Sequence, residues 1–442
     1  MKKLLSIILM IMVLMASFSF TADALYNEYL ENELYSECAI LVCTDNNEVI
    51  FAKEPDKQTK PASLTKVVTA LVVLDELKDL SEVYTVPQGC IDELMGTNSS
   101  LGGLKAGEQY AIYNLLCCLL VHSANDAATT LAYRITGDDR QAFVDKMNAK
   151  VEELGCTNSH FMNVHGLDDD DQYTSARDMA VIFAKAMENP VFAEIVAMPS
   201  YILPESNMQK ERKIATTNFT ILPGYKDYYC PNEIGGKTGT TSGAGHNLVS
   251  AATKNGYNYV CVAMGAPKED FDNDYVDENG AFLDTKAMYD WAYDNLRLVS
   301  IASASKIVGE VKVKYGKSAD HVTLCPSENA LGLMPKGVTA DSLLIIVDEK
   351  SAPEVVNAPL KKGDYICKGE VMYADNSVAE IDLVASQDVK RSYFAYFIGE
   401  FSTWVSSKAF KQGAVIVFVV LIAVVLLGYM VSAKNKKSKK KS

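Results

Sequence analysis

Basic side chains are in short supply in this chain, and the shortage excludes one class of function. The 442 residues include 42 Lys and Arg against 56 Asp and Glu, which gives a formal net charge of −14. A protein that binds the phosphates of a nucleic acid needs an excess of positive charge. We therefore expect no nucleic acid among its partners.

Metal-binding patterns are also missing. The sequence contains no C-x-x-C pair and no H-E-x-x-H run, so no pattern in it indicates a zinc site. The two densest acidic runs, 168–171 and 270–278, lack the spacing of a calcium loop and are expected to be solvated loops. The sequence therefore predicts no metal site and no cofactor.

Cysteines are present but lack the arrangement of a disulfide scaffold. They are spread along most of the chain, and several lie in apolar runs such as Leu115–Val121. A domain of this size can be stable without disulfide bonds. We expect buried free thiols, while pairing stays open, at Cys38, Cys43, Cys90, Cys117, Cys118, Cys156, Cys230, Cys261, Cys325 and Cys367.

A long apolar run stands near each end of the chain. At the N-terminus two lysines precede the apolar stretch 4–20, and Ala22-Asp23-Ala24 forms an A-x-A site, which predicts a signal peptide over residues 1–24. Near the C-terminus Gly413–Val431 carries no charge and is long enough to span a bilayer. Six lysines follow it. We predict a transmembrane helix over 413–432 and a cytoplasmic tail over 433–442.

Three short motifs follow one another with long gaps between them. They are Ser63-Leu64-Thr65-Lys66, Ser123-Ala124-Asn125 and Lys237-Thr238-Gly239. Each alone has an ordinary explanation, as a helix start, a loop or cap, and a hairpin turn. Only this set has this order, and K-T-G occurs once. The set resembles that of penicillin-binding proteins and class A β-lactamases, in which the middle motif is S-D-N.

The first motif suits an activated serine. Pro61 precedes Ser63 and a run of apolar residues follows Lys66, so Ser63 is predicted in the first turn of a buried helix. Spacing i to i+3 puts the Ser63 hydroxyl and the Lys66 amine on one helical face. Burial, the helix N-terminus and a second cation at Lys237 all disfavour charge on Lys66. A neutral amine there can accept the serine proton.

The third motif suits recognition of a carboxylate. It lies in the glycine-rich stretch 235–243, which predicts a strand edge kept bare for the close approach of a substrate backbone. Lys237, Thr238 and Thr240 offer a positive charge and two hydroxyl donors to a carboxylate, with Gly239 between them.

A wider resemblance covers about residues 26–296. The sequence resembles the D-alanyl-D-alanine carboxypeptidases, which are low-molecular-mass penicillin-binding proteins of the S11 serine peptidase family. The matching stretches are Pro61–Lys66, His122–Ala128, His160–Leu167, Tyr173–Ala180 and Gly236–Leu248.

The resemblance implies roles for residues at the matching positions. Ser63 would form the acyl-enzyme and Lys66 would be its base. Ser123 and Asn125 would line the cleft, relay protons and hold the substrate amide. The terminal carboxylate would be bound by Lys237, Thr238 and Thr240, and the backbone N–H groups of Ser63 and Thr240 would form the oxyanion hole. The implied substrates are peptidoglycan stem peptides ending in D-Ala-D-Ala, and the implied inhibitors are β-lactams.

The family pattern is not complete. Some relatives place an arginine for the substrate carboxylate after the last core strand, whereas the corresponding stretch 267–284 is acidic and has no arginine. His165 lies in a family segment beneath the site. We interpret it as structural, because a lone histidine is more often satisfied in a loop or core than reactive.

The expected fold class is α+β. We predict a catalytic domain over 25–296, in which an antiparallel sheet backs a helical lobe, and a β-rich accessory domain over 297–388, a small β-sandwich. Aromatic residues at helical spacing predict an amphipathic juxtamembrane segment over 389–412. The catalytic domain would then lie outside the cytoplasmic membrane, anchored by a single span. The expected elements are strands within 38–51, 247–252 and 257–263, and helices over 63–77, 112–133, 139–154, 176–187 and 285–296.

Two other functions share these motifs. A β-lactamase must deacylate rapidly, and class A enzymes use a glutamate and a water for this step. The stretch Glu328–Leu331 is faintly similar to that element, but it follows the K-T-G motif. A non-catalytic penicillin-binding or sensor protein would keep the cleft and lose the chemistry, and the intact pair of Ser63 and Lys66 argues against it.

Overall fold

The chain folds into two compact units. The computed structural model describes residues 34–254, 256–269, 271, 278–374 and 376–438. The first unit comprises Met1–Leu298 with Leu333–Gly337, and the second comprises Val299–Gly332 with Val338–Ser442. The signal peptide predicted over 1–24 lies outside the described residues.

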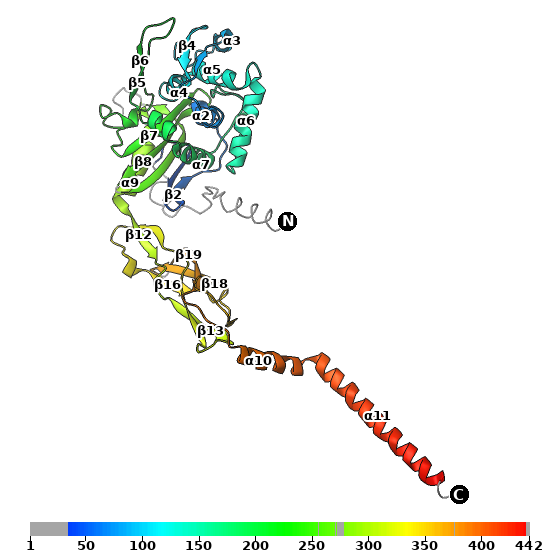
Figure 1. Cartoon of the computed structure of the whole chain (residues 1–442). Coiled ribbons are helices and arrows are strands. Elements are labelled where there is room, and N and C mark those ends of the chain that lie inside the picture. The colour runs from blue at the N-terminus through cyan, green and yellow to red at the C-terminus, as the bar shows by residue number, and fades with distance from the viewer. Residues whose placement is uncertain (1–33, 255, 270, 272–277, 375, 439–442) are drawn as a thin grey trace. The chain divides into compact units, whose positions relative to one another are not determined.

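An antiparallel five-stranded sheet forms the centre of the first unit (Figure 1). Its strand order is β2-β1-β9-β8-β7. The glycine-rich stretch is therefore an edge strand, as predicted. The strands are β1 (Cys38–Cys43), β2 (Glu48–Lys53), β7 (Glu233–Thr241), β8 (Gly245–Lys254) and β9 (Tyr257–Ala266).

Both faces of this sheet are covered. Alternate residues of β1 enter two different cores: Ile40 and Val42 pack with the helical lobe, while Leu41 packs with helix α9 (Gly280–Asn295). Successive strand residues point to opposite faces, so a strand covered on both sides is apolar throughout. The lobe consists of α2 (Thr65–Glu76), α3 (Gln88–Asp92), α4 (Ile112–Leu120), α5 (Asn125–Thr136), α6 (Arg140–Glu153), α7 (Ala176–Met187) and α8 (Pro190–Val196).

One predicted helix is wrong in a way that bears on function. The single helix expected over 112–133 is interrupted, because α4 ends at Leu120 and α5 begins at Asn125. Ser123 lies in this break with a φ of +59°, a left-handed conformation that a helix cannot contain. Apolar periodicity continues through the break because both helices pack into one core. The hydrophobic pattern therefore gave no indication of the turn between α4 and α5.

Several short elements had no clear sequence signal. Three antiparallel strand pairs lie outside the main sheet, and short helical turns begin or link the larger elements. They are β3 (Val83–Thr85) with β4 (Gln109–Ala111), β5 (Ser200–Leu203) with β6 (Arg212–Ala215), β10 (Lys268–Glu269) with β11 (Glu278–Asn279), and the 3-10 turns η2 (Ala62–Leu64) and η3 (Phe219–Ile221).

The second unit is rich in β structure, as predicted. Its six-stranded sheet has the order β16-β18-β19-β14-β13-β17. The two-stranded sheet of β12 and β15 contains residues of both units. The strands are β12 (Leu296–Ala302), β13 (Gly309–Lys314), β14 (His321–Pro326), β15 (Ala330–Pro335), β16 (Leu344–Val347), β17 (Val355–Asn357), β18 (Tyr365–Tyr373) and β19 (Asn376–Ala385), with the turn η4 (Ala340–Ser342).

Two helices end the described chain. Helix α10 (Tyr393–Ser406) carries exposed aromatics, and α11 (Lys408–Ser438) follows it. Among the described residues one helix segment, Lys408–Gly428, is long and apolar enough to cross a membrane. All ten cysteines are buried and free, which confirms the expectation of free thiols.

Candidate active site

A tight turn presents Ser63 at the start of α2. Ser63 lies in η2, which leads directly into α2, and its Oγ is 2.7 Å from Lys66 Nζ. Ala62 beside it has a φ of +48°. A Cβ on Gly166 would lie 1.9 Å from the Ala62 carbonyl oxygen, so only glycine fits beneath this turn. The segment around Gly166 therefore supports the serine from below.

Lys66 is fully buried, and its environment favours the neutral amine. Its Nζ donates a hydrogen bond to the carbonyl oxygen of His165 at 2.6 Å and contacts Ser63 Oγ. Burial, and next the charge of Lys237, hold the pKa of Lys66 well below its ordinary value, against a smaller opposing effect of Asp126. A neutral amine within hydrogen-bond distance of a hydroxyl is the geometry of a general base.

The His165 ring contributes structure to this arrangement. Burial lowers its pKa to about 3, so the ring is neutral, and its Nδ1 accepts a hydrogen bond from the backbone N–H of Leu167 at 3.2 Å. Its carbonyl oxygen orients the Lys66 amine. This geometry fits the structural interpretation made from the sequence.

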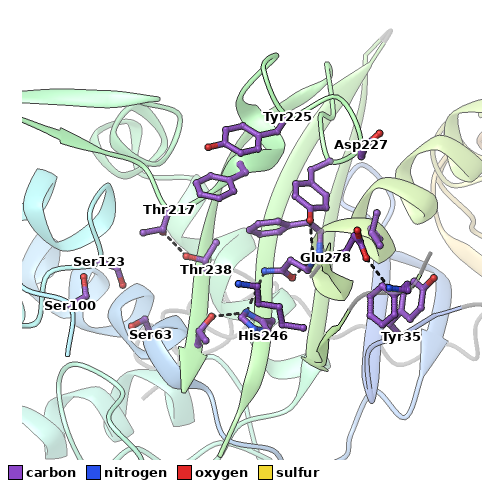
Figure 2. Close-up of a pocket in the computed structure, with 18 residues that line it drawn as sticks. Tyr35, Ser63, Ser100, Ser123, Thr217, Tyr225, Asp227, Thr238, His246 and Glu278 are labelled. Atoms are coloured by element: carbon purple, nitrogen blue, oxygen red, sulfur yellow. Dashed lines mark hydrogen bonds between the residues drawn. The ribbon is translucent and has the colours of Figure 1, made fainter. Parts of the chain in front are cut away.

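The break between α4 and α5 presents Ser123 to the site. Lys237 Nζ donates to Ser123 Oγ at 2.9 Å. The left-handed backbone at Ser123 costs about 1–3 kcal/mol, and such strain is typical of functional sites. Ser100 joins the turn, because its Oγ donates to the His122 carbonyl and its own carbonyl accepts from the Asn125 N–H. Figure 2 shows Ser63, Ser100 and Ser123 close together.

Asp126, directly after the second motif, fixes the loop that carries Ser100. Its buried carboxylate accepts hydrogen bonds from the backbone N–H groups of Gly102 at 2.8 Å and Leu104 at 3.0 Å. Buried carboxylates need such donors. The loop at 100–104 is thereby held against the start of α5.

The edge strand β7 carries the third motif along the other side of the site. Lys237 is 1% exposed, burial lowers its pKa to about 7, and its Nζ also donates to the Thr238 carbonyl. Thr238 Oγ1 lies 2.5 Å from Thr217 Oγ1, and Thr240 Oγ1 lies 3.0 Å from His246 Nδ1 (Figure 2). The threonine hydroxyls and the His246 imidazole thus extend the polar surface of the site beyond Lys66 and Lys237.

Gly239 is required by the packing of the chain itself. A Cβ at this position would lie 2.8 Å from the Pro61 carbonyl oxygen and 3.1 Å from the backbone nitrogen of Ser63. The bare edge of β7 therefore lets the strand approach the turn that carries Ser63. This close approach places Thr240 beside Ser63.

Two cavities meet at Ser63 and Thr240. One has a volume of about 920 Å³ and is also lined by Ser123, Thr238 and His246, and the other, of about 560 Å³, is also lined by Asn125. Lys66 and Lys237 lie buried at their wall through their contacts with the two serines. The structure thus brings together all eight predicted site residues, Ser63, Lys66, Ser123, Asn125, Lys237, Thr238, Gly239 and Thr240.

Other residues at the site were missed in the sequence. Ser100, Thr217, Lys268 and Asn279 line the same cavities, and Asn279 Nδ2 lies 3.3 Å from His246 Nδ1. No motif marked them: Ser100 and Thr217 lie in separate loops, and Lys268 and Asn279 pair in the short strands β10 and β11. His246, by contrast, lies within Gly236–Leu248, one of the stretches that resemble the family. In the described ranges, no group of three or more His, Cys, Asp or Glu side chains could hold a metal ion.

A buried carboxylate ties the Thr217 segment to β7. Glu233 Oε1 accepts from Asn218 Nδ2 at 2.5 Å and Oε2 accepts from Thr220 Oγ1 at 2.6 Å. Although the residue as a whole is half-buried, its carboxylate points inward, and burial raises its pKa to about 7. The fold therefore favours the protonated acid relative to the unfolded chain, where the ordinary pKa is 4.5.

Glu233→Gln is expected to flatten the dependence of stability on pH. The stabilisation from the raised pKa is complete below about pH 4.5 and is lost as the pH rises to about 7, roughly 3 kcal/mol in total. Glutamine cannot ionise, so this loss disappears. Denaturant unfolding at pH 4.5 and at pH 7 measures the change in the free energy of unfolding between the two pH values. The exposed Glu152→Gln is the control. An unchanged loss in Glu233→Gln would contradict this account.

The fold and the three motifs define a protein of the penicillin-binding class. The sequence profile of the D-alanyl-D-alanine carboxypeptidase family of S11 peptidases matches residues 26–268, more than half of the chain. The chain belongs to this family. A second profile, the C-terminal domain of penicillin-binding protein 5, matches residues 297–391.

Relatives extend the similarity over most of the chain. It is 30% identical over 383 residues to the D-alanyl-D-alanine carboxypeptidase DacA of Haemophilus influenzae, covering 85% of this chain and 91% of that protein. It is 28% identical to DacF of Bacillus subtilis over 90% of this chain and 97% of the relative. The crystal structure of penicillin-binding protein 5 from H. influenzae superposes with a TM-score of 0.66 at 28% identity, covering 81% of this chain and 98% of that one.

Proposed function

We infer that the protein is a serine-type D-Ala-D-Ala carboxypeptidase that removes the terminal D-alanine from peptidoglycan stem pentapeptides. The observation that carries this inference is the 2.7 Å contact of Ser63 Oγ with the buried Lys66 amine. Membership of the carboxypeptidase family, whose profile matches residues 26–268, supports it. The same serine would be acylated by β-lactams.

The geometry supports a two-step reaction. Neutral Lys66 takes the proton of Ser63, and Oγ attacks the carbonyl of the penultimate D-alanine. The backbone N–H groups of Ser63 and Thr240 stabilise the oxyanion, which the start of α2 also favours. As the C–N bond breaks, the proton that Lys66 took passes through Ser123, which is hydrogen-bonded to Lys237, to the departing D-alanine amine, and Lys66 is neutral again. Water then hydrolyses the acyl-enzyme and restores Ser63.

The larger cavity suits the substrate carboxylate. Thr238 and Thr240 offer hydroxyl groups there, and Asn125 lines the neighbouring cavity, where it can hold the substrate amide. No arginine occurs in the stretch 267–284. Lys268 lines the same cavity as Thr240, where burial and, next, the charge of Lys268 lower the pKa of His246. We assign Lys268 as the cation that replaces the arginine.

Lys268→Gln is expected to raise KM for a peptide ending in D-Ala-D-Ala roughly fivefold to tenfold with little change in kcat. The variant loses a charge that pairs with the carboxylate in both the ground state and the transition state. Steady-state kinetics measure this effect, and the same peptide with a C-terminal amide is the control. An equal rise in KM for the amide would argue against the assignment.

The inference is tested by comparing a peptide with penicillin. The carboxypeptidase should release D-alanine from a soluble D-Ala-D-Ala peptide and remain acylated by penicillin. A β-lactamase would turn penicillin over, and a non-catalytic binding or sensor protein would release no D-alanine. Glu328, the residue that faintly resembles the deacylating glutamate, lies in the second unit. Rapid penicillin turnover without D-alanine release would overturn the proposal.

We also propose that α11 crosses the cytoplasmic membrane. The apolar segment Lys408–Gly428 supports this proposal, as do the aromatics of α10 and the lysines that follow the apolar run. The mature chain would begin at Leu25. The catalytic domain would extend to residue 296, the β domain to 388 and the juxtamembrane segment to 412. The first unit would then face the cell wall.

Protease added to intact protoplasts is expected to digest the catalytic domain and to spare an epitope fused to the lysine tail. Immunoblots against both ends measure the result, and lysed protoplasts are the control in which both are cut. A protected catalytic domain with a cleaved tail would reverse the topology.

A further inference from the structure

Cations gather at one end of the β domain in an otherwise acidic protein. Three segments meet there, because Gly316 bridges to Arg391, Leu360 bridges to Val389, and the Lys317 N–H donates to the Lys390 carbonyl at 2.7 Å. We call their six basic residues the basic collar: Lys314, Lys317, Lys361, Lys362, Lys390 and Arg391. The whole chain has a net charge of −14, so this positive cluster is a local exception.

The collar side chains are not used in ion pairs. Over the ranges that the structure describes, none of the six lies within 4.0 Å of a carboxylate oxygen. The nearby Asp364 and Asp388 accept hydrogen bonds from the backbone N–H groups of Lys361 and Lys362. Arg391 donates to the Ala358 carbonyl and lies over the ring of Tyr396. Lys314 interacts with the Tyr315 side chain and with the charge of Glu400. The positive charges of Lys317, Lys390 and Arg391, which pair with no carboxylate of the described ranges, remain available to an external anion.

A cavity of about 530 Å³ opens within the collar. Lys317, Lys390 and Arg391 line it together with Ser392, and the aromatic residues Tyr393 and Phe394 complete the lining with Pro359. Tyr393 is 81% exposed and Phe394 is 76% exposed. The site combines three cations with exposed aromatic surface. This combination suits a ligand that is anionic at one end and apolar at the other.

Helix α10 is fixed to the collar. Tyr315 packs edge-on against Tyr396 with ring centroids 5.2 Å apart, and the Ser392 N–H donates to the Tyr315 carbonyl at 2.8 Å. A Cβ on Gly399 would lie 2.4 Å from the Tyr315 ring, so glycine permits this close packing. The helix continues with exposed Phe397, Phe401 and Trp404. The aromatic helix is therefore held directly beside the collar.

We propose that the basic collar binds the phosphate of an anionic phospholipid at the outer surface of the membrane. Lys317, Lys390 and Arg391 would contact the phosphate, and Tyr393 and Phe394 would contact the glycerol and the first acyl carbons. Charge complementarity carries the phosphate assignment, and the exposed aromatics favour a lipid over a soluble phosphate. The proposal rests on the proposed membrane span of α11, and it concerns a site separate from Ser63.

The test is lipid enrichment around the full-length protein. The chain is reconstituted in phosphatidylcholine bilayers with a small fraction of phosphatidylglycerol and extracted, and the lipids that copurify are counted by mass spectrometry. The wild type should be enriched in phosphatidylglycerol, and Lys317→Gln with Lys390→Gln should reduce this enrichment at least roughly fivefold. The control pair, Lys306→Gln with Lys336→Gln, removes the same charge from exposed lysines outside the collar and should retain it.

Other outcomes would contradict the proposal or its premises. Wild-type enrichment in the collar variant would overturn the proposal, as would complete displacement of the lipid by inorganic phosphate or by a soluble polyanion. Unchanged thermal unfolding shows that the collar variant is folded. Failure of every variant to enter bilayers would refute the membrane span, whereas loss of D-alanine release would refute the proposed enzyme activity without affecting the lipid result.

Discussion

Replacing Ser63 by alanine is expected to abolish both covalent labelling by penicillin and release of D-alanine, a loss of more than roughly a thousandfold. Removing Oγ leaves the Lys66 amine without the nucleophile that lies 2.7 Å away. The fold should persist, because Ser63 is half-buried in a short turn and the loss of one oxygen opens no large cavity. Labelling with a fluorescent penicillin and thermal unfolding measure the two properties.

A matched control for this variant exists in the chain. Ser303 also stands three residues before a lysine, Lys306, but it lies in the second unit, where its Oγ contacts Ser305. Ser303→Ala should retain full labelling. Residual labelling of Ser63→Ala would show that another residue is the nucleophile and would remove the basis of the proposed function.

The second large effect is expected at Lys66. Lys66→Arg should lose acylation by more than about a hundredfold, because a guanidinium stays protonated and cannot accept the serine proton. Its larger head must also fit a site in which the amine already contacts Ser63 and the His165 carbonyl. Single-turnover acylation by penicillin measures the rate, and thermal unfolding separates lost chemistry from lost folding.

Lys237→Arg is the comparison for that variant. It keeps the positive charge beside Ser123 and should mainly weaken binding of the substrate carboxylate, so acylation should remain measurable. In the wild type the acylation rate should rise with pH as Lys66 loses its proton, because its lowered pKa governs the fraction of free base. Equal, near-wild-type acylation rates in both variants would contradict the two roles.

The sequence predicted the elements whose residues form a clear local pattern. The continuous apolar runs of β1 and α2 follow from local composition, because both elements are buried almost throughout their length. The glycine-rich stretch predicted an edge strand because glycines leave the strand backbone open to a substrate. The structure adds that Gly239 is needed for contact with the Ser63 turn, a requirement that spacing alone does not reveal.

The turn at Ser123 was missed because hydrophobic periodicity does not register a backbone reversal. Two helices that pack into the same core keep one apolar pattern across the break. The left-handed residue between them is a serine rather than the glycine that would have marked such a turn. The motif predicted that Ser123 is functional, and the tertiary structure supplied the conformation that presents it.

By itself, the sequence determined the three motifs, the apolar segment near the C-terminus and the division into a mixed α/β part and a β-rich part, because these are properties of local pattern. Only the tertiary structure decided which distant residues meet. The Lys237 amine reaches Ser123 across 114 positions, and Lys66 reaches the His165 carbonyl across 99. The lowered pKa values of both lysines depend on burial, which no single segment creates. Burial and long-range contact arise only when separate elements pack together. The lowered pKa values of the two lysines and their contacts with the serines are therefore properties of the tertiary structure.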